Sequence, residues 1–379
     1  MMFLEGVRVL DLSRVLAGPL AAQILGDMGA RVLKIEAPAG DDTRAWGPPF
    51  QKGMSAYFQS CNRNKASLVL DLKRPQDRDY LDRLIGVADV MIDNYLPQTK
   101  SRLRLGEKRL RRLNPRLITM SITGFRQGRR NEPGYDAMIQ AESGLMAITG
   151  PARGKPAKVG VAVVDVMTGM MAANGILGAL YRRAGGHEGA ALEISLYQTA
   201  LFSLINVATG HLVSGQKSRR WGNAHANIVP YQPFHCLDGQ LMIAVGNDAQ
   251  FSRLCRILGI EETRFQGLTN GQRVRDRRRV INRLSAAFKQ KKSAELLRDL
   301  KRYAIPSAPI LSIDQAFQRV RSWDPTALIA VSHEECGPME LVASPLQGDG
   351  MRAGHRAPPQ PGENGQALAE QWLNEDVFP

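Results

Sequence analysis

The chain has 379 residues, of which 44% are hydrophobic and 23% are charged. This composition, without any long apolar run, is typical of soluble globular proteins and excludes disordered and membrane-spanning chains. The net charge of +14 at pH 7 suits a ligand or partner that carries negative charge, such as a phosphorylated small molecule, an anionic lipid or a nucleic acid.

The N-terminal segment has neither the basic start nor the continuous apolar stretch of a secretory signal, and its Glu5 and Asp11 argue against a transit peptide. We therefore expect a cytoplasmic protein. The four cysteines lack the paired spacing of metal ligands, and a reducing compartment leaves them as thiols. The sequence thus predicts no disulfide, no metal site and no association with a membrane.

The first third of the chain alternates between short apolar segments and helical patterns. Residues 6–13 (GVRVLDLS) and 31–38 (RVLKIEAP) predict buried strands, and the small-residue segment between them predicts a helix that ends near Gly29. Further strands are predicted at residues 67–73, 88–95 and 117–125. Strand, helix and strand at this spacing form βαβ units, so we expect an open parallel α/β sheet covered by helices.

Ligands of such sheets bind at the loops that follow the carboxyl ends of the strands. Several of these loops contain glycine, but none has the GxGxxG spacing of a dinucleotide site or the GxxxxGK[ST] pattern of a P-loop. The sequence therefore disfavours a nicotinamide-dependent or NTP-dependent enzyme.

The remainder of the chain predicts a second compact region. Residues 135–204 are mainly helical around one strand-like segment, AALEISL, and residues 214–227 are polar and basic. A strand at 239–246 and helices as far as Tyr303 follow, and strand-like segments return after Ile310. The chain is longer than one core usually organises, so two domains, or one with a large insertion, are expected.

Two segments concentrate the basic residues, at 102–116 and 272–284. Apolar residues recur at helical spacing in both, which favours amphipathic surface helices with a solvated basic face. Neither segment contains the aromatic residues that stack on nucleic-acid bases. A basic protein that binds nucleic acid or another anion remains an alternative, although no nucleic-acid-binding module is recognisable.

A single carboxylate, Asp165, lies in the apolar segment GVAVVDVMTGMMAANGILGAL at residues 160–180. One interpretation is a helix cap, because an aspartate near a helix start accepts backbone N–H groups and suits the positive helix end. The other is a covalent nucleophile, since small apolar neighbours hydrate a carboxylate poorly and leave space for a substrate. The residues alone leave both interpretations open.

Six segments resemble, in their order and spacing, the family III CoA transferases, the group that includes formyl-CoA and carnitine-CoA transferases, and the resemblance covers almost the whole chain. The segments are GVRVLDLSRVLAGPLAAQILGDMGARVLKIEAPAGDDTR, NRNKASLVLDLK, ADVMIDNY, NPRLITMSITGF, GYDAMIQAESGLMAITG and GVAVVDVMTGMMAANGILGAL. The resemblance implies that Asp165 is the nucleophile and that CoA moves through an aspartyl-CoA thioester. It also implies an acyl-CoA thioester as substrate, with no permanently bound cofactor.

The resemblance assigns further site residues by position. The CoA-contacting segments of the family correspond to Val15 and Leu16, to Leu70 through Lys73, and to Asn94, Tyr95 and Leu96, and a basic residue near the CoA phosphates corresponds to Arg102. Tyr135 and Asp136 correspond to residues beside the nucleophile. For these last two, a helix N-cap is an equally good interpretation.

The segment RWGNAHANIVPYQPF resembles the substrate loop of members that move CoA between succinyl-CoA and other dicarboxylates. His225 and Asn227 lie on this loop, where each is able to orient an acceptor carboxylate by hydrogen bonds; a purely structural role for His225 stays open. The chain departs from the family at Leu96, Gln98 and Ala37, where other members have arginine or glycine. The acids themselves are not identified.

The resemblance also implies the architecture. A large Rossmann-like CoA-binding domain with a parallel sheet is expected from residues 1–215 and 325–379, and a smaller α/β domain from residues 225–320. Two chains are expected to interlock as a homodimer. The nearest alternative on the same fold is an α-methylacyl-CoA racemase, which needs a base on each face of the substrate. Tyr135 lies where racemases have a histidine, so a racemase is disfavoured.

Overall fold

The structure, a computed structural model, describes residues 1–375. The chain divides into a first unit, residues 1–145, 159–214 and 321 onward, and a second unit, residues 146–158 and 215–320. The sequence-based division assigned residues 146–158 to the large domain. The structure groups them with the second unit, because the Arg220 guanidinium donates to the carbonyl oxygens of Ala147 at 3.0 Å and Gly154 at 2.8 Å.

The first unit is an α/β fold around a six-stranded parallel sheet with the order β5-β2-β1-β6-β7-β8. This confirms the predicted α/β fold with a parallel sheet. The strands are β1 (Arg8–Asp11), β2 (Arg31–Glu36), β5 (Lys65–Val69), β6 (Val90–Asp93), β7 (Ile118–Thr123) and β8 (Ala191–Ser195).

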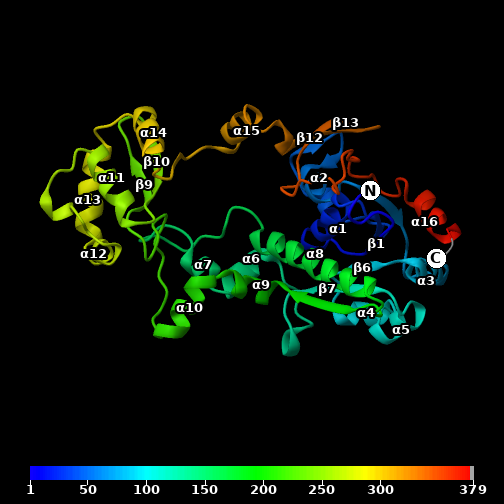
Figure 1. Cartoon of the computed structure of the whole chain (residues 1–379). Coiled ribbons are helices and arrows are strands. Elements are labelled where there is room, and N and C mark those ends of the chain that lie inside the picture. Colours follow the sequence, from blue (N-terminus) through cyan, green and yellow to red (C-terminus); the bar gives the residue numbers. More distant parts are fainter. Residues whose placement is uncertain (376–379) are drawn as a thin grey trace. The chain divides into compact units, whose positions relative to one another are not determined.

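Helices cover both faces of this sheet (Figure 1). On one face, α1 (Ala17–Asp27) and α8 (Val163–Ala184) pack together in one hydrophobic cluster. On the other, α3 (Pro75–Val87), α5 (Glu107–Leu113) and the C-terminal α16 (Gly365–Asn374) contribute to a second cluster. Strands covered on both faces favour apolar residues at successive positions, and Val9 and Leu10 of β1 and Val90, Met91 and Ile92 of β6 are fully buried.

Shorter elements complete the first unit. They are β3 (Phe50–Gln51), β4 (Met54–Ser55), α2 (Ala56–Cys61), α4 (Pro97–Arg102), α6 (Asp136–Glu142), α9 (Leu196–Ser203), α10 (Ile205–Ser214), β12 (Leu328–His333) and β13 (Gly337–Val342). Two further helices, α7 (Leu145–Ile148) and α15 (Ile313–Arg321), include residues of both units.

Among the described residues, one helix, α8, is long and apolar enough to cross a membrane by length and composition alone. The sequence alone predicted no membrane-spanning segment. In the structure, α8 packs against α1 and contributes Val164, Ala172 and Ile176 to the core of the first unit. Burial in that core accounts for the apolar side chains on this face of α8, whereas Met170, Met171 and Tyr181 are exposed.

The second unit contains a small antiparallel sheet with the order β11-β10-β9, formed by β11 (Ser307–Pro309), β10 (Gln240–Ala244) and β9 (Tyr231–His235). Four helices pack with it around a separate core: α11 (Asp248–Ile257), α12 (Asn270–Arg275), α13 (Arg277–Phe288) and α14 (Ser293–Arg302).

The basic segment at 272–284 is only partly the solvated helix face that its spacing predicted. Arg273 is fully buried; its guanidinium donates to the carbonyl oxygen of Val229 at 2.6 Å and pairs with Asp248 at 2.7 Å. Arg277 donates to the carbonyl oxygens of His225 at 2.9 Å and Ala226 at 2.5 Å. These two arginines hold the loop before β9, so their charge serves the fold rather than a partner.

Candidate active site

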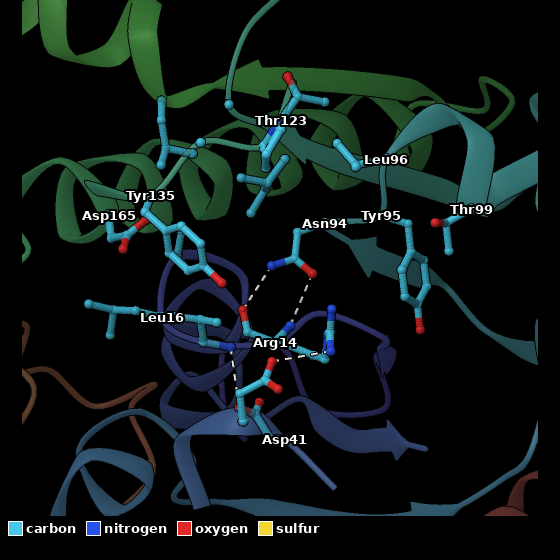
Figure 2. Close-up of a pocket in the computed structure, with 18 of the residues that line it drawn as sticks. Arg14, Leu16, Asp41, Asn94, Tyr95, Leu96, Thr99, Thr123, Tyr135 and Asp165 are labelled. Carbon is cyan, nitrogen blue, oxygen red and sulfur yellow. Dashed lines mark hydrogen bonds and ion pairs between the residues drawn. The ribbon is translucent and has the colours of Figure 1, made fainter. Parts of the chain in front are cut away.

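The site lies at the carboxyl ends of the parallel strands in the first unit. The chain adds β2 and β5 on one side of β1, and β6, β7 and β8 on the other, so the strand order reverses between β1 and β6. Open α/β sheets bind ligands at this switch point. A cavity of about 400 Å³ opens there, lined by the loops that follow β1, β2, β6 and β7 together with Tyr135 and Asp165 (Figure 2).

Asp165 is the third residue of α8 and is only 9% exposed. Within residues 1–375, no group donates a hydrogen bond to its carboxylate and no cation pairs with it. Burial, and next the negative charge of Asp136, raise the pKa of Asp165 to about 7. Near neutral pH this carboxylate is therefore ionised in about half of the molecules, and no cation or hydrogen-bond donor among the described residues compensates its charge.

The carboxylate that caps α8 is that of Asp136, in the first turn of α6. Its Oδ1 accepts the backbone N–H of Val164 at 2.8 Å and of Asp165 at 3.3 Å. Its Oδ2 accepts from Gln140 Nε2 at 2.6 Å, and Gln140 Oε1 accepts the backbone N–H of Val159 at 2.8 Å. The capping interpretation of Asp165 is therefore wrong, because another residue satisfies the helix start and leaves Asp165 free.

Tyr135 stands beside Asp165 at one side of the cavity, and Tyr95 and Thr99 stand at the other (Figure 2). Two glycines place Tyr135 there. A Cβ on Gly124, which follows β7, would lie 2.7 Å from the Cα of Gly134, and a Cβ on Gly134 would lie 2.5 Å from the Cα of Gly124. Only two glycines allow these backbones to approach so closely.

Tyr57, in α2, also lies near Asp165, and the sequence analysis missed it. Burial, then the charges of Asp165, Cys61, Asp136 and Asp41, raise the pKa of Tyr57 to about 12. Its phenol therefore remains protonated at neutral pH. Trp46 packs edge-on against it, with ring centroids 5.2 Å apart. The segment that carries both aromatic residues has no regular periodicity, so no sequence signal linked them to Asp165.

The structure brings seven of the predicted site residues to one cavity: Val15, Leu16, Asn94, Tyr95, Leu96, Tyr135 and Asp165. Four others do not line it. Leu70 is buried in the second hydrophobic cluster of the first unit, Lys73 is exposed, and Asp136 caps α8. Arg102 does not line the cavity, but its guanidinium donates a 3.2 Å hydrogen bond to Oγ1 of Thr99, which does. A residue can lie near the end of a predicted strand without its side chain facing the cavity.

Positive charge in the cavity comes from a residue that the sequence analysis did not select. Among the described lining residues, Lys34 is fully buried in an ion pair with Asp41 at 2.9 Å. Arg14 is half-exposed and pairs with the equally exposed Asp42 at 3.1 Å. An exposed ion pair is weak, so Arg14 is available to a phosphate. Its position directly after the first predicted strand is the sequence signal that could have identified it.

His225 and Asn227 belong to the second unit. The Nδ1 atom of His225 accepts the backbone N–H of Asn227 at 3.0 Å, and the imidazole stacks on Tyr231 with centroids 5.4 Å apart. Asn270 Nδ2 donates to the carbonyl oxygen of Asn227 at 2.8 Å. These contacts give the loop a defined conformation.

Residues 1–375 contain no group of three or more His, Cys, Asp or Glu side chains arranged to hold a metal ion. The thiols of Cys61, Cys236, Cys255 and Cys336 are all buried and unpaired with one another. The cavity itself presents the buried, unpartnered carboxylate of Asp165 next to the hydroxyls of tyrosines and a half-exposed guanidinium.

Comparison with known proteins identifies the family. The model of CoA-transferase family III matches residues 4–365. This protein belongs to CoA-transferase family III. It is therefore a CoA-transferase that acts on acyl-CoA thioesters.

Its relatives agree with this assignment. The chain is 38% identical to a succinyl-CoA:glutarate CoA-transferase of Mus musculus, over 94% of this chain and 83% of the relative. It is 42% identical to a succinate–glutarate CoA-transferase of Agrobacterium fabrum, over 83% and 81%. A crystal structure of a CAIB/BAIF family protein from Brucella suis superimposes with a TM-score of 0.84 at 35% identity, covering 98% of this chain and 99% of that one.

Proposed function

We propose that this CoA-transferase moves CoA from succinyl-CoA to a short dicarboxylate, with glutarate as the foremost candidate, through a thioester on Asp165. The observation that carries the proposal is the state of Asp165: a buried carboxylate without a partner, at the end of a cavity at the switch point of the sheet. A carboxylate with a raised pKa is a stronger nucleophile than an ordinary one when ionised.

The proposed reaction begins when a carboxylate oxygen of Asp165 attacks the carbonyl carbon of succinyl-CoA. The C–S bond breaks, which gives a mixed aspartyl-succinyl anhydride and the CoA thiolate. The thiolate attacks the aspartyl carbonyl, so that succinate leaves and an aspartyl-CoA thioester forms. The acceptor carboxylate then repeats both steps in the reverse sense, which releases the new acyl-CoA and restores Asp165. Each step exchanges one acyl bond for another, so the acyl group stays activated throughout.

The cavity supports these steps through its walls. Asp136 satisfies the α8 N–H groups, so the Asp165 oxygens are not held in a cap and remain free to attack. Arg14 offers an exposed guanidinium for a CoA phosphate, for which a planar fork of donors is well suited. His225 and Asn227 remain proposed contacts for the acceptor, because their loop resembles that of dicarboxylate-using members.

The decisive experiment is intact-mass analysis after mixing the protein with succinyl-CoA and quenching with hydroxylamine or borohydride. We expect a modification that peptide mapping places on Asp165 and that the Asp165→Ala variant lacks. Asp89→Asn, which alters a buried aspartate outside the cavity, serves as a control and retains the modification. Transfer assays with glutarate and other acceptors then identify the acid. A preference for a monocarboxylate donor and acceptor would contradict the proposed substrates.

We also propose that the chain acts as an interlocked homodimer. The helix α15 has no buried residue and exposes Ile313 (76%) and Phe317 (37%). Several apolar side chains of α8, α9 and α10 are exposed as well: Met170, Met171, Tyr181, Leu201, Phe202, Leu212 and Val213. So many exposed apolar groups favour a protein interface. Sedimentation at nanomolar concentration tests this, since an interlocked dimer does not dissociate on dilution; a monomer would contradict it.

A further inference from the structure

The loop that follows β1 has a strained conformation where it lines the cavity. Val15 has a φ of 73°, in the left-handed region that a β-branched side chain rarely adopts. Such a conformation persists only where surrounding contacts enforce it, and it is found mainly at functional sites. Val15 and its neighbours Leu16 and Ala17 all line the cavity.

Side chains from other elements hold three consecutive residues of this loop. Lys34 Nζ donates to the carbonyl oxygen of Ser13 at 2.8 Å. Asn94 clamps Arg14 twice, since its Oδ1 accepts the Arg14 N–H at 3.1 Å and its Nδ2 donates to the Arg14 carbonyl oxygen at 2.8 Å. Asp41 Oδ1 accepts the N–H of Val15 at 3.3 Å. The strained residue is therefore held by Asp41.

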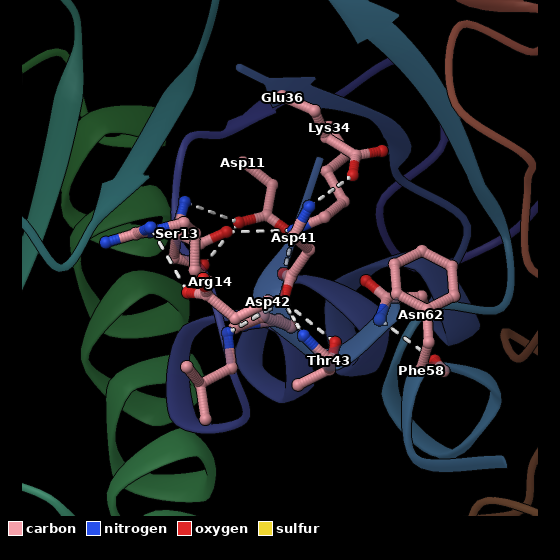
Figure 3. A network of polar contacts seen from close by, with 12 residues as sticks. Asp11, Ser13, Arg14, Lys34, Glu36, Asp41, Asp42, Thr43, Phe58 and Asn62 are labelled. Carbon is pink, nitrogen blue, oxygen red and sulfur yellow. Dashed lines mark hydrogen bonds and ion pairs between the residues drawn. The ribbon is translucent and has the colours of Figure 1, made fainter. Parts of the chain in front are cut away.

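Asp41 is itself fixed by buried contacts, and Figure 3 shows it between the Lys34 side chain and Thr43. Its Oδ1 also accepts the N–H of Thr43 at 3.0 Å and the Thr43 hydroxyl at 2.8 Å. Its other oxygen pairs with Lys34 Nζ at 2.9 Å, and both side chains are fully buried. Its own N–H donates to Glu36 Oε2 at 2.9 Å. These contacts fix the orientation of the Asp41 carboxylate, and hence the position of the oxygen that accepts the Val15 N–H.

We propose that Asp41 is a positioning residue, which holds Val15 in its left-handed conformation so that the loop after β1 is preformed to receive CoA. The inference rests on the proposed function of the cavity as the CoA site. Preforming a loop raises affinity because binding then loses less conformational freedom. Asp41 acts through the Val15 main chain and takes no part in the transfer of the acyl group.

Calorimetric binding of CoA tests the inference on the folded protein. We expect Asp41→Ala to raise the Kd for CoA about tenfold, a ratio that corresponds to about 1.4 kcal/mol. Asp41→Asn keeps an oxygen acceptor for the Val15 N–H but loses the ion pair with Lys34, so it is expected to recover only part of the affinity. The control is Asp89→Asn, which disrupts the buried Asp89–Arg183 pair at the amino end of β6. It is expected to lower the melting temperature and to leave the Kd within about twofold.

A second variant separates positioning from a general loss of stability. Glycine adopts positive φ without steric cost, so Val15→Gly in the Asp41→Ala background is expected to recover part of the lost CoA affinity. A merely structural Asp41 predicts no such recovery. If Asp41→Ala does not fold, Thr43→Val provides a milder change, because it removes only the hydroxyl that orients Asp41; a rise of about threefold in Kd is expected.

A Kd for Asp41→Ala within twofold of that of the wild type would overturn the inference. CoA binding does not require turnover, so the two proposals fail separately. A wild type that binds CoA but transfers it to no acid overturns the proposed reaction alone. A wild type that does not bind CoA overturns both.

Discussion

At the scale of single residues, Asp136 and Asp165 are identical side chains in different roles: Asp136 caps a helix, whereas Asp165 has a free carboxylate. Asp136 accepts three N–H groups, two of them from the backbone at the start of α8, and so acts as the cap of that helix. Asp165, next to it, accepts none and has a pKa of about 7. A buried, uncompensated carboxylate destabilises the fold when ionised, so we expect a measurable conflict between stability and activity at this residue.

The first expected consequence concerns stability and pH. Because the folded-state pKa of Asp165 is above its ordinary value, the stabilisation from its proton is complete below about pH 4 and is lost as pH rises through about 7. At pH 8 we expect Asp165→Asn to be more stable than the wild type by up to about 4 kcal/mol. At pH 4 the difference should vanish. Urea unfolding at both pH values measures it, and a difference independent of pH would contradict the assignment.

The second consequence concerns the rate. Attack requires the ionised Asp165, so kcat/KM for succinyl-CoA is expected to rise with pH and to level off above about pH 8. Asp136→Asn keeps the Oδ1 acceptor for the α8 N–H groups, but it removes the negative charge that raises the Asp165 pKa in addition to the larger effect of burial. We expect the rise of kcat/KM with pH to occur at lower pH in this variant than in the wild type. Glu142→Gln, an exposed change on the same helix, is the control and should leave the profile in place.

At the scale of elements, the site depends on close approaches between backbones. The Gly124–Gly134 contact joins the end of β7 to the turn that carries Tyr135 into the cavity, and it links the sheet to α6 and through Asp136 to α8. A change at this contact therefore acts on Tyr135 and on the α8 start together.

We expect Gly124→Ala to destabilise the protein by about 2 kcal/mol, because its Cβ would meet backbone atoms of Gly134 that have no space to move. CoA transfer should fall as well, since Tyr135 shifts. Gly128→Ala is a matched control in the same loop, where an added Cβ meets nothing within 4 Å. Chemical unfolding and transfer rates compare the two variants. Equal behaviour of both would show that the glycine contact does not position the site.

At the scale of the whole molecule, the charge is divided unequally. The second unit contains 22 Lys or Arg and 8 Asp or Glu residues, a difference of 14 that equals the net charge of the entire chain. The first unit is neutral by the same count. Because acyl-CoA and dicarboxylates are anions, a strongly basic unit attracts both of them over a distance that salt shortens.

We expect kcat/KM for succinyl-CoA to fall several-fold between about 20 and 200 mM salt, while kcat changes much less, because screening acts on encounter and not on acyl transfer. Steady-state rates at a series of ionic strengths measure this. A kcat/KM that does not depend on salt would show that the excess charge of the second unit has no influence on substrate capture.

The sequence by itself determined the alternation of strands and helices, the parallel α/β sheet and the location of Asp165 at the start of a helix. These features follow from local patterns: apolar periodicity, small residues and strand length. The resemblance to family III CoA transferases added the nucleophile. Of the eleven residues that the resemblance assigned to catalysis or CoA binding, seven line one cavity in the structure.

Only the tertiary structure decided which carboxylate caps α8, that Tyr57 lies near Asp165, that Arg273 is buried and that residues 146–158 join the second unit. The physical reason is distance along the chain. Asp136 reaches the α8 start from 29 residues away, and Arg273 reaches Val229 across 44. A local pattern specifies which element forms, whereas the pKa of a carboxylate and the lining of a cavity depend on the partners that folding brings to them.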